Sequence, residues 1–179
     1  MYWENLEGTF TYQTLYSSMV NNSNNAVFVE IGTWKGKSAV FMAEKIRESR
    51  KNIKFYTIDL FENIKGYDSD LDIIAGTVLE KYYKNIEPVK NYLETLIGDS
   101  KELYKNFENE SIDFLFLDGD HTYKGVLKDL QLWFPKVKIG GIAAGHDYDE
   151  DSCGVRQAVD QFFGFGAKQY AGGCWIFYK

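Results

Sequence analysis

Acidic residues follow directly after two short apolar runs of the chain, in the segments 30–38 and 118–121. Each segment lies where a strand is expected to end and a helix to begin. In open α/β sheets, ligands bind in the crevice beyond the carboxyl ends of the strands. The two segments therefore predict a single crevice that holds a nucleoside-like cofactor beside a polar reaction centre with metal-binding potential.

The first segment has the residue types expected around a small, positively charged ligand. Gly32 and Gly36 would let the backbone pass close to a ligand, and the hydroxyl of Ser38 could join the N–H groups of the next helix. The carboxylate of Glu30 suits an ammonium or sulfonium group better than a pyrophosphate. The spacing departs from the G-x-G-x-x-G fingerprint of dinucleotide sites. A tight turn that binds nothing is the alternative.

Acidic residues also end the next two expected strands. Asp59 follows the apolar residues 53–58 and could accept two hydrogen bonds from a ribose diol. Asp99 or Ser100 could reach an adenine amino group, or could simply cap the following helix. For Asp59 the alternative is a solvated side chain at a strand end.

The densest polar group is formed by the second segment together with a later histidine. Asp118 and Asp120 project to the same side of an extended backbone, and His121 follows them. His146 and Asp147 end the next expected strand, so both histidines of the chain lie at neighbouring strand ends. Carboxylates with imidazole suit a divalent cation, and oxygen-rich ligation favours magnesium or manganese. His121 could instead be a general base, and hydrogen-bonded histidines without metal are a further alternative.

Other residues near these strand ends are given a structural interpretation. We expect Lys35, Lys37 and Lys124 to be solvated, and the aromatic-rich stretch 10–16 to belong to the core. The polar segment 61–72 is the best candidate for a mobile lid or substrate loop.

Alternating strands and helices must position these residues. The hydrophobic periodicity predicts a mainly parallel sheet covered on both faces by helices, ending in an antiparallel hairpin. Strands are expected at residues 26–30, 53–58, 92–97, 112–117, 137–144, 165–170 and 174–178. Helices are expected at residues 11–20, 38–49, 73–86, near 103–107, at 126–134 and at 155–163, where residues 151–152 could cap the last.

The bulk composition bounds the class of protein. A chain of 179 residues with 45% hydrophobic residues fits one folded domain, residues 1–179, with residues 1–25 as a short helical extension. The net charge of −6 argues against nucleic-acid or anionic-membrane partners. No membrane span, secretory signal or disulfide framework is evident, so a cytoplasmic location is expected.

Several motifs together resemble one enzyme family. Residues 29–40 (VEIGTWKGKSAV) resemble the first motif of class I S-adenosylmethionine-dependent O-methyltransferases, in the form seen in catechol O-methyltransferase and in macrocin O-methyltransferase-like proteins. Residues 114–123 (FLFLDGDHTY), 140–141 with 146–147, and 154–159 (GVRQAV) resemble later motifs of the macrocin-like group.

This resemblance implies a Rossmann-like three-layer sandwich with a seven-stranded sheet. It implies S-adenosylmethionine as cofactor, with Asp59 at the ribose and Asp99 with Ser100 near the adenine. The metal would lie on Asp118, His146 and Asp147. The cofactor contacts it implies are Glu30, Gly32, Thr33, Gly36, Ser38, Asp59, Asp99, Ser100 and Asp118. The catechol-type enzymes carry a lysine where this chain has His121.

The leading hypothesis is transfer of a methyl group to a hydroxyl of a sugar, phenol or polyol, with Asp118, Asp120 and His121 as the catalytic residues. The alternatives are a nicotinamide-dependent oxidoreductase and a non-catalytic S-adenosylmethionine-binding module. Macrocin-type relatives have more structure before the first strand, so the site is expected to be open or to be covered by a second subunit of a homo-oligomer.

Overall fold

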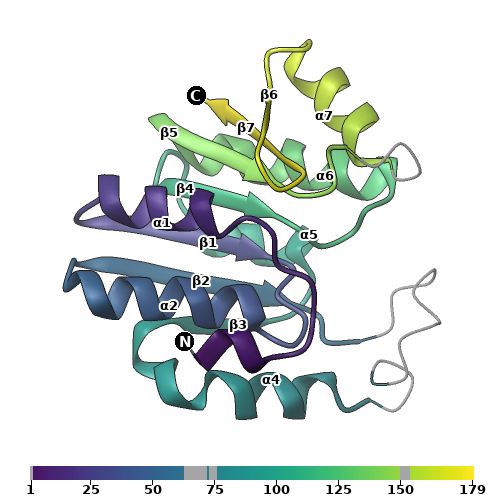
Figure 1. The fold of residues 1–179 in the computed structure, drawn as a ribbon. Coiled ribbons are helices and arrows are strands. Elements are labelled where there is room, and N and C mark those ends of the chain that lie inside the picture. Colours follow the sequence, from purple (N-terminus) through teal and green to yellow (C-terminus); the bar gives the residue numbers. More distant parts are fainter. Residues whose placement is uncertain (1, 63–71, 73–75, 150–153) are drawn as a thin grey trace.

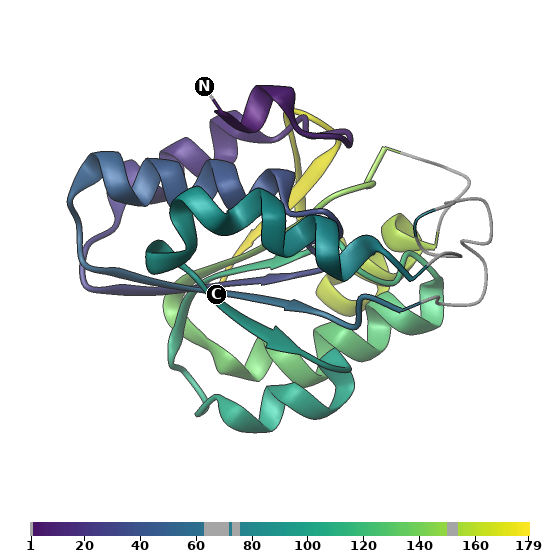
Figure 2. The same ribbon diagram turned by 90° about the horizontal axis from the view of Figure 1, so that it is seen from below.

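The computed structural model describes residues 2–62, 72, 76–149 and 154–179. Within these residues a seven-stranded sheet lies between two layers of helices (Figures 1 and 2). The strands follow the order β3-β2-β1-β4-β5-β7-β6. They are β1 (Ala26–Ile31), β2 (Ile53–Asp59), β3 (Glu94–Ile97), β4 (Ile112–Leu117), β5 (Val137–Gly145), β6 (Lys168–Tyr170) and β7 (Cys174–Tyr178).

The first five strands are parallel and the last two are antiparallel to their neighbours, which confirms the predicted fold class. β7, the second strand of the terminal hairpin, pairs with both β5 and β6 and so lies between them, while β6 forms the edge of the sheet. The sequence order reverses at β1, which lies between β2 and β4. The crevice beyond this reversal point is where open α/β sheets bind ligands.

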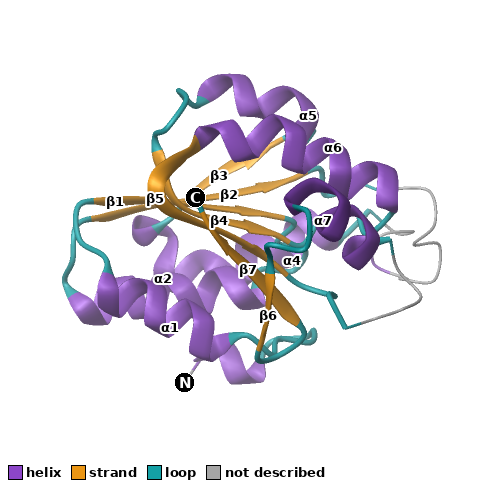
Figure 3. Cartoon of the chain, turned by 90° about the horizontal axis from the view of Figure 1, so that it is seen from above, coloured by secondary structure: helices purple, strands orange, loops and turns teal. Residues whose placement is uncertain are grey.

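Helices cover both faces of the sheet (Figure 3). On one face, α1 and α2 bury Tyr16 and Phe41 against the aromatic side chains of β1 and β4. On the other face, α6 and α7 bury Trp133 and Val159 against the same strands. The α-helices are α1 (Gln13–Asn22), α2 (Lys37–Ser49), α4 (Val78–Ile86), α5 (Ser100–Leu103), α6 (Tyr123–Trp133) and α7 (Val155–Phe163), with 3-10 turns at η1 (Tyr2–Asn5), η2 (Glu87–Tyr92), η3 (Tyr104–Asn106) and η4 (Phe134–Lys136).

The elements differ from the predicted ones mainly at their ends. Of the helix expected at 73–86, residues 73–75 lie outside the described residues, and α4 begins at Val78. The strand expected from residue 92 begins at Glu94, because η2 continues to Tyr92. Most of the predicted lid, and the cap at residues 151–152, lie outside the described residues.

The carboxyl ends of the five parallel strands meet at one edge of the sheet. The segment between η1 and α1 runs past this edge before α1 turns back along the sheet (Figure 1). We call residues 6–12 the N-terminal segment. It brings residues from the start of the chain to the same place as the strand ends.

Candidate functional site

A cavity of about 620 Å³ opens at the carboxyl edge of the sheet. This volume is in the range of small-molecule sites. The N-terminal segment lines it together with residues that follow β1, β2, β3, β4 and β5. The predicted site residues that line it are Gly32, Thr33, Ser38, Asp59, Asp99, Ser100, Asp118, Asp120, His121, His146 and Asp147.

Two predicted cofactor residues, Glu30 and Gly36, do not belong to the described lining of this cavity. Glu30 is 1% exposed and accepts a hydrogen bond from the Tyr16 hydroxyl at 2.9 Å. Burial raises the pKa of the Glu30 carboxyl to about 7, although the hydroxyls of Ser38 and Tyr16 oppose this shift. Glu30 therefore lies behind the residues that line the cavity, where it is bonded to Tyr16 of the core.

Gly32 allows close packing between two strand ends and not only the approach of a ligand. Its φ is +84°, and a Cβ atom there would lie 2.1 Å from the carbonyl oxygen of Asp118. The glycine thus lets the turn after β1 lie directly against the turn after β4. Gly32 also lines the cavity, so the approach of a ligand to its backbone stays a prediction.

The Asp59 carboxylate holds the turn after β1 from the end of β2. Its Oδ2 accepts hydrogen bonds from the backbone N–H groups of Thr33 and Trp34, both at 2.8 Å, and its Oδ1 accepts one from Phe61 N–H at 2.8 Å. A carboxylate has roughly four acceptor sites. Three are used by described residues, which leaves one for a hydroxyl in the cavity that Asp59 lines, as far as the described part of the chain shows.

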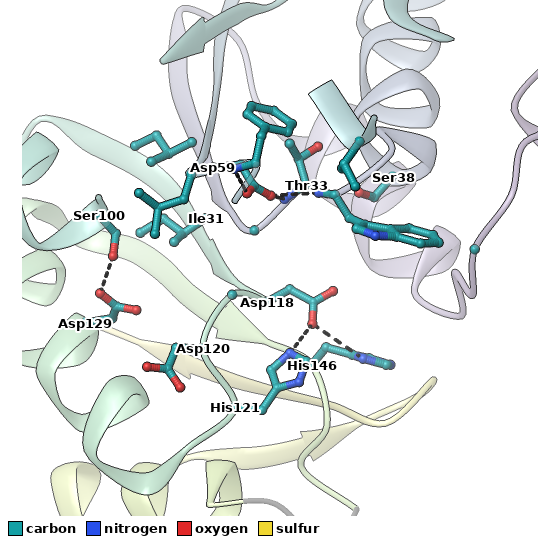
Figure 4. A pocket seen from close by; sticks show the side chains of 18 of the residues that line it. Ile31, Thr33, Ser38, Asp59, Ser100, Asp118, Asp120, His121, Asp129 and His146 are labelled. Carbon is teal, nitrogen blue, oxygen red and sulfur yellow. Dashed lines mark hydrogen bonds and ion pairs between the residues drawn. The ribbon is translucent and has the colours of Figure 1, made fainter. Parts of the chain in front are cut away.

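The β3 end of the cavity contains a carboxylate that sequence reasoning missed. Asp129 of α6 is 4% exposed and accepts a hydrogen bond from the Ser100 hydroxyl at 2.7 Å (Figure 4). Burial raises the pKa of the Asp129 carboxyl to about 6. Asp99 caps α5 through a bond from Lys101 N–H at 2.9 Å, so the capping interpretation holds for that residue. Asp129 falls on the apolar face of an amphipathic helix, three residues after Val126, and this position is the signal that could have found it.

Four side chains gather at the ends of β4 and β5, and we call them the Asp–His cluster: Asp118, His121, His146 and Asp147. His121 Nε2 lies 3.4 Å from Asp118 Oδ1 and 3.2 Å from Asp147 Oδ2. His146 Nδ1 lies 2.8 Å from Asp147 Oδ1 and 3.7 Å from Asp118 Oδ1. Figure 4 shows both imidazoles directed at the Asp118 carboxylate.

The cluster differs from the predicted metal set by including His121. Asp118, His121 and Asp147 each offer a ligand atom, and these atoms all lie within 4.8 Å of one another. Such a set is compact enough to surround one cation, with His146 beside it. Asp120 is turned elsewhere: its Oδ1 accepts from Thr122 N–H at 2.9 Å, and its Oδ2 lies 3.6 Å from Lys101 Nζ.

Charge and burial oppose each other in the Asp–His cluster. Burial disfavours the charged form of His146, but Asp147 and Asp118 outweigh it and raise the pKa of His146 to about 9. The pKa of His121 is raised for the same reason, by Asp118 and Asp147 against the effect of burial. Burial raises the pKa of Asp147, but the two histidines outweigh it and lower that pKa. The two carboxylates of the cluster therefore favour positive charge on its two histidines.

Two residues of the N-terminal region complete the cluster. The Tyr12 hydroxyl donates to Asp118 Oδ2 at 2.9 Å, and Thr11 Oγ1 lies 3.0 Å from His146 Nε2. Tyr12 is also part of the core, as predicted for the aromatic stretch 10–16. No pattern in the sequence connects this stretch with histidines more than a hundred residues later.

One of the lysines expected to be solvated is buried. Lys35 is 5% exposed, lies 2.8 Å from Glu7 Oε2, and forms an ion pair with Asp72. Lys81 of α4 lies 2.8 Å from the same Asp72 oxygen. These ion pairs connect the N-terminal segment, the turn after β1 and α4. Lys35 therefore contributes to the packing of these segments and is not a solvated side chain. Lys124 is exposed, as expected.

In the part of the chain that the structure describes, every helix is too short or too polar to cross a membrane.

Residues 29–148 match a family model described as a methyltransferase domain. Among curated proteins, an uncharacterised protein of Acanthamoeba polyphaga mimivirus is 29% identical over 154 residues, which cover 82% of this chain. A Sinorhizobium fredii protein is 25% identical over 146 residues, which cover 79% of this chain. The chain spans 58% of the length of the first relative and 14% of the second.

Solved methyltransferases share this fold. The O-methyltransferase NovP aligns with a TM-score of 0.73 and 20% identity, over 93% of this chain and 78% of that protein. The calicheamicin methyltransferase CalS11 aligns with a TM-score of 0.67 and 15% identity, over 92% and 76%. An O-methyltransferase of Bacillus cereus, solved with SAH, aligns with a TM-score of 0.65 and 16% identity, over 97% and 83%.

Proposed function

Because the chain belongs to the methyltransferase domain family, we propose that it transfers a methyl group from S-adenosylmethionine to a hydroxyl of a small molecule. Sugars, phenols and polyols are the acceptor classes that fit, and a divalent cation assists. The observation that carries this proposal is a single cavity that joins the ends of β2 and β3 to the Asp–His cluster.

The chemistry of the lining fits the cofactor. The free acceptor site of Asp59 suits a ribose hydroxyl, and Asp129 beside Ser100 suits the amino group of an adenine. Asp118 contributes negative charge near the centre of the cavity, where it would favour a sulfonium. When bound, S-adenosylmethionine supplies an activated methyl group, so the protein needs mainly to align the two reactants.

The Asp–His cluster fits a divalent cation because oxygens of Asp118 and Asp147 and an imidazole nitrogen of His121 lie within 4.8 Å of one another. A bound cation would lower the pKa of an acceptor hydroxyl. Without a cation, His121, which borders the same space and lies within reach of two carboxylates, would accept the hydroxyl proton; with the cation bound, its imidazole would be a ligand instead. The cluster thereby fixes the end of the cavity at which the acceptor binds.

Calorimetry with S-adenosylhomocysteine tests the cofactor part of this proposal. We expect binding in the micromolar range, weakened at least about tenfold in Asp59→Ala, which loses the ribose acceptor and the support of the turn after β1. Lys124→Ala, an exposed position, is the matched control and should bind like the parent. Absence of heat at millimolar ligand would contradict the proposal.

Turnover distinguishes the enzyme from a binding module. Incubation with radiolabelled methyl donor and a panel of sugars, phenols and polyols should label at least one acceptor, and His121→Ala should reduce the rate. Cofactor binding with no labelled product on any acceptor would favour the non-catalytic module. The oxidoreductase alternative is disfavoured by the family, and it predicts binding of a nicotinamide cofactor instead.

A further inference from the structure

The Asp–His cluster offers two imidazole nitrogens as well as carboxylate oxygens. Asp147 lies between the histidines, with Oδ2 3.2 Å from His121 Nε2 and Oδ1 2.8 Å from His146 Nδ1. Asp118 turns Oδ1 toward both histidines, while its Oδ2 accepts from Tyr12. Each carboxylate therefore has an oxygen directed at nitrogen atoms inside the cluster.

The hydrogen bonds of Thr11 determine which nitrogen of His146 faces the cluster without a proton in the neutral ring. The Thr11 hydroxyl has one proton, which it donates to the Gly172 carbonyl at 2.7 Å. Its oxygen must therefore accept the 3.0 Å bond from His146 Nε2–H. In the neutral ring the proton is then on Nε2, and the lone pair of Nδ1 points at the two carboxylates.

This arrangement is typical of a metal-binding histidine. Such histidines donate their second ring N–H to an oxygen, which fixes the ring orientation and directs the other nitrogen at the metal. Ligating carboxylates are likewise held by hydrogen bonds, as Asp118 is by Tyr12. The N-terminal segment thus supplies an orienting partner to one histidine and one carboxylate of the cluster.

We propose that the Asp–His cluster selects a first-row transition-metal dication over magnesium, through imidazole nitrogen. This inference rests on the proposed function only in placing a divalent cation in the cluster. Magnesium prefers oxygen ligands, whereas imidazole suits zinc, iron, nickel and cobalt. With the imidazole of His121 in the compact ligand set and that of His146 beside it, two imidazoles border the cation site, where the sequence predicted one.

Cobalt is the probe, because its visible absorption reports nitrogen ligation without any turnover. We expect chelator-treated protein to bind Co²⁺ on the order of 100-fold more tightly than Mg²⁺, as measured by absorption and by calorimetry. His121→Asp, which replaces nitrogen by oxygen, should reduce this preference at least about tenfold. Thr11→Val, which removes the orienting hydroxyl but keeps the side-chain shape, should weaken Co²⁺ binding about 10- to 100-fold.

Asp113→Asn is the matched control, because Asp113 is a carboxylate outside the cavity lining that pairs with Lys138, and it should bind Co²⁺ like the parent. Equal affinity for Mg²⁺ and Co²⁺, or an unchanged preference in His121→Asp, would overturn the inference and leave the cation of the proposed function intact. Absence of binding by any dication, with S-adenosylhomocysteine still bound, would overturn the inference and the metal assistance, but not methyl transfer.

Discussion

At the scale of single residues, the buried carboxyl of Glu30 makes the stability of the fold depend on pH. Its pKa is raised from 4.5 to about 7 by burial, so between these values the unfolded chain loses a proton that the folded protein keeps. Stability should therefore fall as pH rises through this window, by roughly 3 kcal/mol in total. Glu30→Gln keeps the shape of the side chain and removes the titration.

Urea unfolding from pH 4.5 to 8 measures this effect as a difference between the two proteins. The parent should lose stability relative to Glu30→Gln as pH rises. Parallel pH profiles would show that the Glu30 carboxyl titrates normally in the folded protein.

Individual side chains at strand ends were predictable, but their partners were not. The position of acidic residues directly after apolar runs was enough to predict that Asp59, Asp118 and Asp147 line one cavity. It did not reveal that Asp59 already accepts three backbone N–H groups, because those donors come from turns whose conformation is set by the assembled sheet. Lys35 was misjudged for the same reason, since its ion-pair partners Glu7 and Asp72 come from distant segments.

At the scale of the elements, the contact between the ends of β1 and β4 depends on Gly32. A Cβ atom at Gly32 would meet the Asp118 carbonyl oxygen at 2.1 Å, and its φ of +84° strains any other residue. We expect Gly32→Ala to lower the free energy of unfolding. Gly140→Ala is the matched control, because Gly140 has φ +80° but no atom within 4 Å of the same Cβ position.

Chemical denaturation separates the two effects. Gly140→Ala should cost about 1–2 kcal/mol for the left-handed backbone alone, and Gly32→Ala should cost about 2 kcal/mol more, because backbone atoms must move apart. Equal losses for the two variants would mean that the strand ends move apart without cost.

The order and type of the elements followed from hydrophobic periodicity, because strands buried on both faces and amphipathic helices have different repeats. Their ends followed less well. η2 shortens β3 by two residues, since it continues to Tyr92, and α4 begins at Val78, after residues 73–75 that lie outside the described part of the chain. The insertion of β7 between β5 and β6 is a property of the sheet that periodicity does not encode.

At the scale of the whole molecule, Gly172 in the terminal hairpin holds the N-terminal segment in position. A Cβ atom there would lie 2.3 Å from the carbonyl oxygen of Thr11, at a φ of +78°. Gly172→Ala should therefore displace the N-terminal segment and speed the amide hydrogen exchange of residues 6–12 at least about tenfold. Gly164→Ala, at φ +58° with open space around the Cβ position, is the control and should leave that exchange unchanged.

Mass spectrometry of exchanged peptides provides the measurement, and cobalt binding by the same variants shows whether the cluster depends on the segment. Unchanged exchange in Gly172→Ala would mean that the segment is held by its other contacts, such as the bond from Lys37 Nζ to Gly8 O at 3.0 Å.

The contacts between the N-terminal segment and the terminal hairpin could not be predicted from the sequence. Thr11 contacts His146 and Gly172 across separations of 135 and 161 residues, and contacts at such separations leave no periodic pattern in the sequence. The N-terminal segment contributes residues to the cavity lining, while the choice between an open site and one covered by a second subunit stays a prediction. Tyr12 and Thr11 line or support the site because the folded sheet returns the hairpin to them.

The link between Thr11 and Gly172 also bears on how the protein is made. During synthesis, Thr11 leaves the ribosome 161 residues ahead of the carbonyl that receives its proton. Until that carbonyl emerges, His146 lacks the fixed partner that orients its ring. A nascent chain can build the central strands early, but the Asp–His cluster reaches its final arrangement only after the terminal hairpin has emerged.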